Sequence, residues 1–275
     1  MGISYKSPGE LEKMWAADQV VCRVLDELEA MIQPGISTGD IDQRARDLVR
    51  AYDVIPAFLG YGHPPFPAVV CVSVNDEVVH GIPRGERVLR EGDIVSVDFG
   101  VDKGGYFGDA ARTFPVGTIS AEAKELLEIT EEALERAIAR CVVGGRLRDI
   151  SGAIQAFVES RGFSVVRAFY GHGIGKRMHE DPLVPNFVDD SKGWQGFTQR
   201  RLRNPKLKRG MVLAIEPMVN VGTADVSIDG DGWTARTKDG KLSAHFEHSV
   251  AITDNGPWVL SRRTGDGKSL KSQGN

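Results

Sequence analysis

Residues 89–98 read Leu-Arg-Glu-Gly-Asp-Ile-Val-Ser-Val-Asp, and residues 207–216 read Leu-Lys-Arg-Gly-Met-Val-Leu-Ala-Ile-Glu. The two stretches align without a gap, and the aligned residues are identical or similar except at the third and fifth places. Both stretches end on a carboxylate, so Asp98 and Glu216 take the same place in the alignment. The chain therefore contains an internal repeat, and the alternative is that two short segments match by chance.

The segments that precede these stretches follow one order in both halves. Apolar residues at helical spacing predict a helix over 10–31 and a second helix over 40–52. The same pattern predicts helices over 120–143 and 149–161, with a Gly-containing turn inside each pair. Each half therefore begins with two helices and continues with strands.

A shorter motif supports the same division of the chain. Tyr-Gly-His occurs at 61–63, after the first helix pair, and again at 170–172, after the second. Two halves built alike predict one α+β domain, an α/β two-layer structure, with approximate twofold symmetry and a site between the halves. We expect a single domain over 1–275, with halves over about 10–118 and 119–260.

The composition is that of a folded protein without a strong charge bias. Hydrophobic residues make up 41% and charged residues 26%, and the net charge of -4 argues against broad binding to nucleic acid or to anionic membranes. The scattered residues Cys22, Cys71 and Cys141 are predicted to be reduced thiols. No signal peptide and no apolar run of membrane-spanning length is present. We expect a cytoplasmic monomer that binds neither a membrane nor specific DNA.

Two polar segments fall outside the repeat. The stretch 186–208 is predicted to be an exposed basic loop, and the tail over 262–275 is predicted to be flexible. A transient contact with RNA or the ribosome is the alternative to a merely solvated loop. That alternative rests on the positive charges of Lys192, Arg200, Arg201, Arg203 and Lys206.

Two carboxylates lie on a predicted β-hairpin. Strands over 94–99 and 106–114 flank the turn 102–105, and if the ends of that turn pair, Asp98 and Asp109 are direct cross-strand neighbours. Directly opposed side chains have Cβ atoms about 4.5 to 5.5 Å apart, where like charges destabilise a sheet. Either a shared proton or a bound cation would offset this repulsion.

Three further residues decide between the shared proton and the cation. His172 lies in the Gly-rich segment 171–175, Glu216 ends an apolar strand, and Glu247 lies in the alternating run 244–252. Each residue taken alone also fits a bland role, as a satisfied loop histidine or a salt-bridged strand carboxylate. The segment 171–175 lacks the spacing of a phosphate-binding loop, and the chain has no Gly-x-Ser-x-Gly serine nucleophile.

Together with the hairpin pair, these residues supply four carboxylates and one imidazole. That donor set favours hard or borderline divalent ions such as manganese, iron(II) or cobalt, and it also accepts zinc. Five such ligands suffice for two ions if some carboxylates bridge. The residues therefore favour a centre with two divalent metal ions.

Five motifs in this order resemble the methionine aminopeptidase family, and the compact chain is most similar to its bacterial type I members. The motifs are Asn-Asp-Glu-Val-Val-His-Gly-Ile-Pro at 75–83, the pair Asp98 and Asp109, the segment 171–175, Glu-Pro-Met at 216–218 and Glu-His at 247–248. The resemblance runs from about Ser7 to Leu260. It implies the pita-bread (creatinase/aminopeptidase) fold, which has pseudo-twofold symmetry.

The resemblance also implies a role for each metal ligand. Asp109 and Glu247 would bridge two ions, Asp98 would complete one site, and His172 and Glu216 would complete the other. The family uses cobalt, manganese, iron(II) or zinc, so the physiological metal stays open. Some members also hold a monovalent cation, at a place that corresponds to the surroundings of Asn75 and Ser243 in this chain.

By the same resemblance, the chain would remove the N-terminal methionine from nascent proteins and peptides, preferably when the second residue is small. A metal-activated water would attack the scissile carbonyl, and Glu216 would move its proton. His179 would stabilise the developing oxyanion, and His80 would contact the scissile or following amide.

The resemblance places five residues around the methionine side chain. They are Tyr61, Phe66, Cys71, Met178 and Trp233. Core packing alone would also explain all five of them. Some family members have an aromatic residue at the position of Met178, so the shape of the pocket is open.

Two other functions fit parts of the pattern. An aminopeptidase or dipeptidase that acts before proline has the same fold, but such enzymes usually carry an additional N-terminal domain for which this chain has no room. A binding protein of this fold, which contacts ribosomes or RNA after losing catalysis, would lack metal ligands. All five implied ligands are present in this chain.

Overall fold

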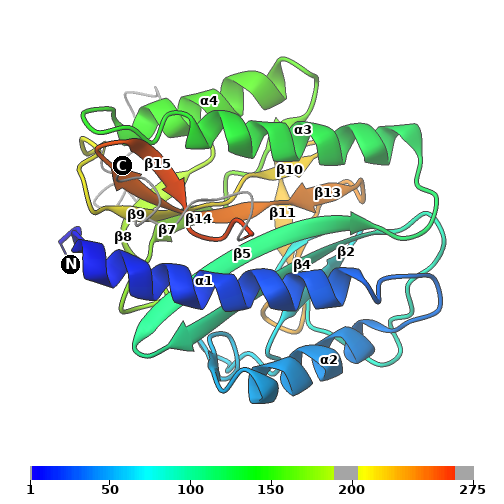
Figure 1. Ribbon diagram of the computed structural model, residues 1–275. Helices are drawn as coiled ribbons and strands as arrows, with labels where there is room; N and C mark the ends of the chain where they lie inside the picture. Colours follow the sequence, from blue (N-terminus) through cyan, green and yellow to red (C-terminus); the bar gives the residue numbers. More distant parts are fainter. Residues whose placement is uncertain (1, 189–203, 264–275) are drawn as a thin grey trace.

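The computed structural model describes residues 2–188 and 204–263 of the 275-residue chain (Figure 1). Its four helices occur as two pairs, as the sequence predicts. Ser7 and Ser37 each close a capping box with an acidic residue three positions later, so the starts of α1 and α2 are fixed by local hydrogen bonds. The helices are α1 (Pro8–Glu29), α2 (Thr38–Ala51), α3 (Ala121–Ile138) and α4 (Leu147–Glu159).

The third helix ends earlier than its sequence pattern predicts. The pattern predicts a helix over 120–143, but α3 ends at Ile138, and Val142 and Val143 are 43% and 48% exposed in the following turns. These two valines therefore do not continue the apolar face of α3. The Gly pair that follows them lies in a later turn and does not end the helix.

The central sheet is nearly symmetric about its middle, with the strand order β1-β4-β5-β14-β9-β7-β8. Strands β5 and β14 form its middle, β4 and β9 flank them, and β1 and β7 lie outside those. Strand β15 pairs with β14, and β2 pairs with β4. The bounds are β1 (Ile55–Pro56), β2 (Cys71–Val74), β4 (Ile94–Lys103), β5 (Tyr106–Pro115), β7 (Tyr170–Gly173), β8 (Glu180–Pro185), β9 (Val212–Ile215), β14 (Glu247–Thr253) and β15 (Gly256–Val259).

Two smaller sheets complete the fold. Their strand orders are β13-β10-β6 and β11-β12-β3. The bounds are β3 (Glu77–Val79), β6 (Ser164–Val165), β10 (Met218–Asn220), β11 (Val226–Ile228), β12 (Ala235–Thr237) and β13 (Ser243–His245).

This symmetric strand order confirms the internal repeat. The aligned stretches 89–98 and 207–216 lead into β4 and β9, which take equivalent places beside the two middle strands. The Tyr-Gly-His match is not part of this repeat, because 170–172 lies in β7 whereas 61–63 lies in a loop. In the strand order the counterpart of β7 is β1.

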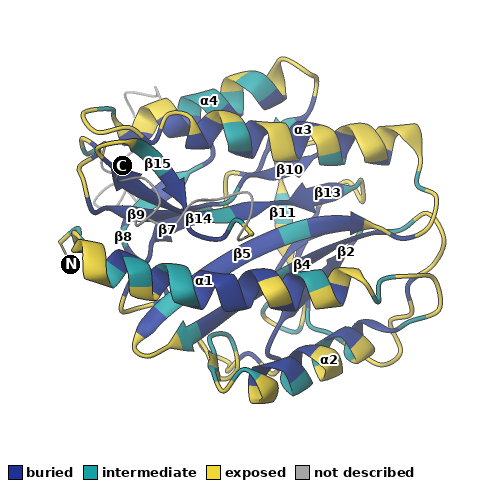
Figure 2. Ribbon diagram, viewed as in Figure 1, coloured by how far each residue is buried: buried dark blue, intermediate teal, exposed yellow. Residues whose placement is uncertain are grey.

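Each helix pair covers its own half of the sheet. Helix α1 lies across β4 and β5, and α3 packs against β9, β10, β13 and β14 (Figure 1). One apolar core joins α1 and α2 to β2, β4 and β5, and a second joins α3 and α4 to the strands of the second half. The middle strands are consequently buried along most of their length (Figure 2).

The sequence-based register of the β4–β5 hairpin is wrong by two residues. Lys103 pairs with Tyr106, and the two-residue turn consists of Gly104 and Gly105, with φ angles of 62° and 81°. Two positive φ angles are what the twist of a tight hairpin demands. Asp98 therefore pairs with Ala111, and Asp109 pairs with Gly100, instead of with each other. Because side chains alternate with a period of two, this shift leaves both carboxylates on one face of the sheet.

The predicted basic loop and the predicted flexible tail lie mostly outside the described residues. Residues 189–203 and 264–275 are not described, which includes most of the basic residues of the loop. The described flanks of the loop are partly buried, with Asn186 fully enclosed and Leu207 1% exposed. At the start of the tail, Arg262 forms an ion pair with Glu135, so this residue has a fixed contact.

The remaining composition-based expectations concern cysteines and membrane spans. All three cysteines are buried free thiols. Among the described residues, no helix has the length and apolar character needed to cross a membrane.

The hairpin turn gives a direct test of the register. We expect Gly105→Val to lower the free energy of unfolding by about 1 to 2 kcal/mol, because a β-branched side chain is strained at positive φ. Gly104→Asn is the matched control, since Asn tolerates this conformation and a Cβ at either glycine would have open space around it. Urea unfolding measures both values. Equal losses in the two variants would contradict the backbone explanation.

Candidate metal centre

A cavity of about 180 Å³ brings the predicted site residues together. Every residue that the sequence analysis named as a metal ligand, catalytic group or pocket residue lines this cavity. One further lining residue, Phe58, was missed, although it belongs to the same loop as Tyr61 and its carbonyl accepts the Tyr61 N–H. The lining residues are Phe58, Tyr61, Phe66, Cys71, His80, Asp98, Asp109, His172, Met178, His179, Glu216, Trp233 and Glu247.

The strand register explains how three carboxylates meet. Ala111 on β5 pairs with Asp98 on β4 and with Glu247 on β14, so these three residues form one row across three strands. Residues paired across a sheet project from the same face. Asp109 lies two residues before Ala111 and projects from that face as well. The small side chain of Ala111 leaves open the space between the carboxylates.

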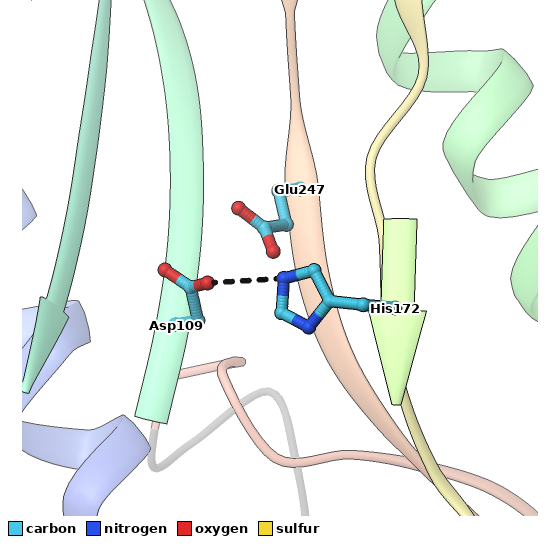
Figure 3. A group of neighbouring side chains, drawn as sticks. All are labelled: Asp109, His172 and Glu247. Atoms are coloured by element: carbon cyan, nitrogen blue, oxygen red, sulfur yellow. Dashed lines mark ion pairs between the residues drawn. The ribbon is translucent and has the colours of Figure 1, made fainter. Parts of the chain in front are cut away.

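The imidazole enters the same space from the other half of the chain. His172 on β7 pairs with Ala214 on β9, and its Nε2 lies 3.8 Å from Oδ2 of Asp109 and 3.7 Å from Oε1 of Glu216. Figure 3 shows Asp109, His172 and Glu247 converging from three strands. One ligand atom of each residue lies within 4.8 Å of those of the other two. The site therefore lies where the two halves of the sheet join.

A backbone contact orients the ring of His172. Its Nδ1 lies 3.0 Å from the carbonyl oxygen of Gly173, which can only accept a hydrogen bond. The proton therefore resides on Nδ1, and the Nε2 lone pair faces the carboxylates. This is the arrangement that a metal-ligating histidine requires.

Burial dominates the electrostatics of the site. It raises the pKa of Asp98 to about 7, and it raises the pKa values of Asp109, Glu216 and Glu247 well above their usual range, with repulsion among the carboxylates adding to the effect. It also lowers the pKa of His172 to about 3. Without a compensating charge, these four carboxylates cannot all ionise near neutral pH.

The donor atoms fit a divalent cation. Oδ1 of Asp98, Oδ1 of Asp109 and Oε1 of Glu247 are buried and have no hydrogen-bond partner in the described part of the chain. Buried carboxylate oxygens without donors need a cation or a proton. Oxygen donors with one neutral imidazole nitrogen match manganese, iron(II), cobalt or zinc. The site thus fits the metal that the sequence predicts.

Two histidines lie beside the metal-ligand candidates. The ring of His179 lies 4.2 Å from the ring of His172, and its Nδ1 lies 2.7 Å from the hydroxyl oxygen of Tyr61. Burial lowers the pKa of His80 to about 4, with the nearby His179 adding to this effect, and burial also lowers the pKa of His179. Both rings are therefore neutral at pH 7.

The backbone at His80 is unusual, with a φ of 60° in a residue that is not glycine. Such a conformation costs free energy and persists where the surroundings impose it. The ring packs edge-on against Phe169 and Trp233, at centroid distances of 5.3 and 5.9 Å. These contacts hold the imidazole at the cavity wall.

A further polar group at this site was not predicted from the sequence. His245 on β13 is 2% exposed, and its Nε2 lies 3.7 Å from Oε2 of Glu216. Burial lowers its pKa to about 3, and that nitrogen has no hydrogen-bond partner among the described residues. Its place two residues before Glu247 was the only sign of this in the sequence.

An ion pair anchors the segment that carries Met178 and His179. Lys6 Nζ lies 2.9 Å from Oε2 of Glu180, and both side chains are almost fully enclosed, at 6% and 5% exposure. Ser4 donates a second hydrogen bond to the same oxygen. Burial raises the pKa of Glu180, but the bonds from Ser4 and Lys6 outweigh it and hold that pKa below its usual value. The N-terminal segment thereby fixes the residue next to His179.

A doubled α+β domain with a carboxylate-rich centre between its halves is the architecture of a metal-dependent hydrolase. The chain belongs to metallopeptidase family M24, whose family model matches residues 12–254. This assignment agrees with the resemblance carried by the sequence motifs, and the pita-bread fold is confirmed.

Within this family, the chain is similar to bacterial methionine aminopeptidases over nearly its whole length. It is 50% identical to the methionine aminopeptidase of Clostridium acetobutylicum, covering 94% of this chain and 98% of that protein. It is 42% identical to that of Escherichia coli K12, covering 97% and 96%.

Solved structures give the same grouping. A methionine aminopeptidase of Thermotoga maritima superposes with a TM-score of 0.88 at 44% identity, over 95% of this chain and all of that one. A prolidase of Pyrococcus furiosus has a TM-score of 0.74 at 20% identity, and this chain covers 66% of it. The prolidase shares the fold alone.

Removing metal should expose the electrostatic cost of the site. A carboxyl whose pKa is raised by folding stabilises the fold below its unfolded pKa, and this stability is lost as the pH rises through the folded pKa. We therefore expect the metal-free protein to unfold at a lower temperature at pH 8 than at pH 5.5. About 1.4 kcal/mol is lost per pH unit for each carboxyl that is protonated in the folded state and ionised in the unfolded state.

Thermal unfolding with a chelator, and again with excess manganese, measures this effect. Asp98→Asn is the control, because it removes the group whose pKa is about 7 and should flatten the decline. Manganese should stabilise the parent protein more at pH 8 than at pH 5.5. A metal-free protein whose stability rises between these pH values would refute the electrostatic account.

Proposed function

We propose that this chain is a methionine aminopeptidase that removes the N-terminal methionine from nascent proteins and peptides. The observation that carries the proposal is that one cavity is lined both by the carboxylate-rich centre and by an apolar cluster that includes Phe58, Phe66 and Trp233. Such a cavity can hold the free amine and scissile bond of a peptide beside the metal centre, with the first side chain in the apolar pocket. The similarity to methionine aminopeptidases supports this reading.

The ligand set would hold two divalent ions. By the family resemblance, Asp109 and Glu247 would bridge the ions, Asp98 would complete one site, and His172 and Glu216 would complete the other. The short distances from His172 Nε2 to Asp109 and to Glu216, 3.8 and 3.7 Å, support this grouping. Divalent ions supply Lewis acidity there, which makes a hydroxide nucleophile available near neutral pH. The buried oxygens without hydrogen-bond partners support this assignment.

Glu216 is suited to hold the proton that the attacking water releases. Its Oε1 lies 3.7 Å from Nε2 of His172, so the carboxylate lies among the other ligand candidates, where it can take up that proton. The second oxygen of Glu216 faces the neutral ring of His245, which places a hydrogen-bonding group behind it. A general acid–base works best when its pKa lies near the working pH.

His179 would donate a hydrogen bond to the oxyanion that develops on the scissile carbonyl. The Tyr61 hydroxyl can donate to Nδ1 of His179 at 2.7 Å, which leaves the N–H of this neutral ring on Nε2. His80 lies on another wall of the same cavity and would bind the scissile or following amide. Both rings donate without carrying charge.

The pocket residues would enclose an unbranched side chain. Phe66 and Trp233 meet edge to face at 5.3 Å, and the indole N–H of Trp233 donates to the carbonyl of Pro64 at 2.9 Å. Phe58 and Met178 complete the wall. A methionine wall adapts to the shape of its ligand, so this pocket should accept close analogues of methionine. A preference for a small second residue is carried over from the family resemblance.

Several other expectations stay predictions. Ser243 donates its N–H to the carbonyl of Asn75 at 2.9 Å, so a monovalent cation near these residues would bind where the two segments meet. The ribosome contact through 186–208 depends on a loop that lies largely outside the described residues. Cytoplasmic location and a monomeric state also stay predictions.

The reaction and its site can be tested together. We expect metal-stripped protein to release methionine from Met-Ala-Ser only after manganese, iron(II), cobalt or zinc is added. Asp109→Asn should abolish this release with every metal, because it removes a bridging carboxylate. An Ala-Pro peptide serves as the control substrate and should not be cleaved. A folded parent protein that is inert with every metal would instead favour a binding protein.

The role of His179 has its own test. His179→Ala should lower kcat by about 100-fold with a smaller effect on KM, because the lost hydrogen bond acts in the transition state. Tyr61→Phe keeps the pocket ring and removes only the hydroxyl, so kcat should fall roughly 5-fold, equivalent to about 1 kcal/mol. If Tyr61→Phe has the kcat of the parent, the hydroxyl does not set the orientation of His179.

A further inference from the structure

We propose that Asp18, a fully buried residue of α1, is a positioning residue for the metal-ligand candidate Asp109. The proposal rests on the function proposed above, because it assigns Asp18 a task at the same metal centre. Asp18 does not line the cavity, so it would act through the backbone of Asp109 rather than by touching metal or substrate.

The ladder between the two middle strands stops just before Asp109. Strand β14 pairs with β5 at Glu247 with Ala111 and at His248 with Ala110. If the β5–β14 ladder continued in this register, Ser249 would pair with Asp109, but these two residues are not paired. The backbone of Asp109 therefore needs other hydrogen-bond partners on this side.

Two side chains replace the missing ladder. The N–H of Asp109 donates to Oδ1 of Asp18 at 3.1 Å, and the carbonyl of Asp109 accepts from the hydroxyl of Ser249 at 3.1 Å. Both peptide groups that flank the Asp109 Cα are thereby fixed. Since the carboxylate is attached through one Cβ, fixing these groups also fixes its direction into the metal centre.

A close approach of α1 to β5 makes the contact feasible. A Cβ at Gly108 would lie 2.6 Å from the backbone nitrogen of Asp18 and 2.8 Å from the carbonyl carbon of Ala17. Any side chain at this position would push the helix away from the strand. Glycine therefore allows the helix backbone to approach close enough for a short Asp side chain to reach the Asp109 N–H.

A purely structural role would not favour a carboxyl at this position. Asp18 is 0% exposed. The Ser249 side chain interacts with its carboxyl, but its Oδ2 makes no hydrogen bond of normal geometry within the described residues. Burying a carboxyl with one oxygen unpaired costs free energy that an apolar side chain would avoid. The benefit that offsets this cost is the hydrogen bond that Asp18 accepts from a metal-ligand candidate.

Outer-shell residues that orient metal ligands commonly change metal affinity by about 10- to 100-fold when they are removed. We expect Asp18→Ala to weaken manganese binding by a factor in this range. Asp18→Asn should stay within about threefold of the parent, because its amide oxygen can accept the same N–H. The Kd of manganese, obtained by calorimetric titration of metal-stripped protein, is the readout.

Gln19→Leu is the matched control on the same helix. Gln19 Nε2 donates to the carbonyl of Leu260 at 3.0 Å and to that of Arg262 at 2.8 Å, so its loss weakens the anchoring of α1 without removing either side chain that bonds to Asp109. We expect lower thermal stability for Gln19→Leu and an unchanged Kd for manganese. A merely structural role of Asp18 would give the same pattern for Asp18→Ala.

The outcomes separate the two proposals. A parent protein that binds no manganese would overturn both the proposed function and this inference. If the parent binds manganese and Asp18→Ala binds it with the same Kd, this inference alone is overturned. It is also overturned if Asp18→Ala and Asp18→Asn lose manganese affinity to the same extent. If Asp18→Ala does not fold, Asp18→Leu takes its place, because leucine is of similar size and cannot accept the Asp109 N–H. An unchanged Kd in that variant would overturn the inference.

Discussion

The repulsion among carboxylates that share one buried space is the constraint on which the structure depends. Asp98, Ala111 and Glu247 form a row across three strands, and Asp109 and Glu216 add two more acids beside it. Sheet pairing sets these positions, so the acids cannot move apart without breaking the ladder between the halves. A cation or retained protons must therefore offset this repulsion, and the two helix pairs supply the apolar burial that holds the strands together against it.

Much of this arrangement could be predicted from the sequence, because it rests on local patterns that recur. Helical spacing located both helix pairs, and the aligned stretches identified β4 and β9 as equivalent strands, with Asp98 and Glu216 at equivalent places in the alignment. The hairpin register failed because the predicted turn, at Lys103 and Gly104, lies one residue too early. The chemistry of a two-residue turn requires the pair Gly104 and Gly105, and the acids stayed on one face because the error was even.

The rest depends on contacts between residues that are far apart in the chain. Asp18 on α1 contacts the backbone of Asp109, and His245 on β13 lies beside Glu216, but no local spacing connects either residue to its partner. Asp18 occupies a helix face that is otherwise apolar, where a pattern of hydrophobic residues simply passes over it. A buried acid in such a face is a signal, but its meaning emerges only when the strand that packs there is known. The same holds for Phe58, which the loop geometry brings to the pocket.

The ion pair between Lys6 and Glu180 has a practical consequence for anyone who handles this protein. It ties the first described residues to the segment that carries His179, and Ser4 bonds to the same carboxylate. An affinity tag or fusion partner attached ahead of Ser4 would therefore act on the contacts that hold Glu180, the residue next to His179 in the cavity wall. An activity measured on protein immobilised through this end of the chain would therefore include the effect of the attachment on the site. A label on the exposed face of α4 would leave the site undisturbed.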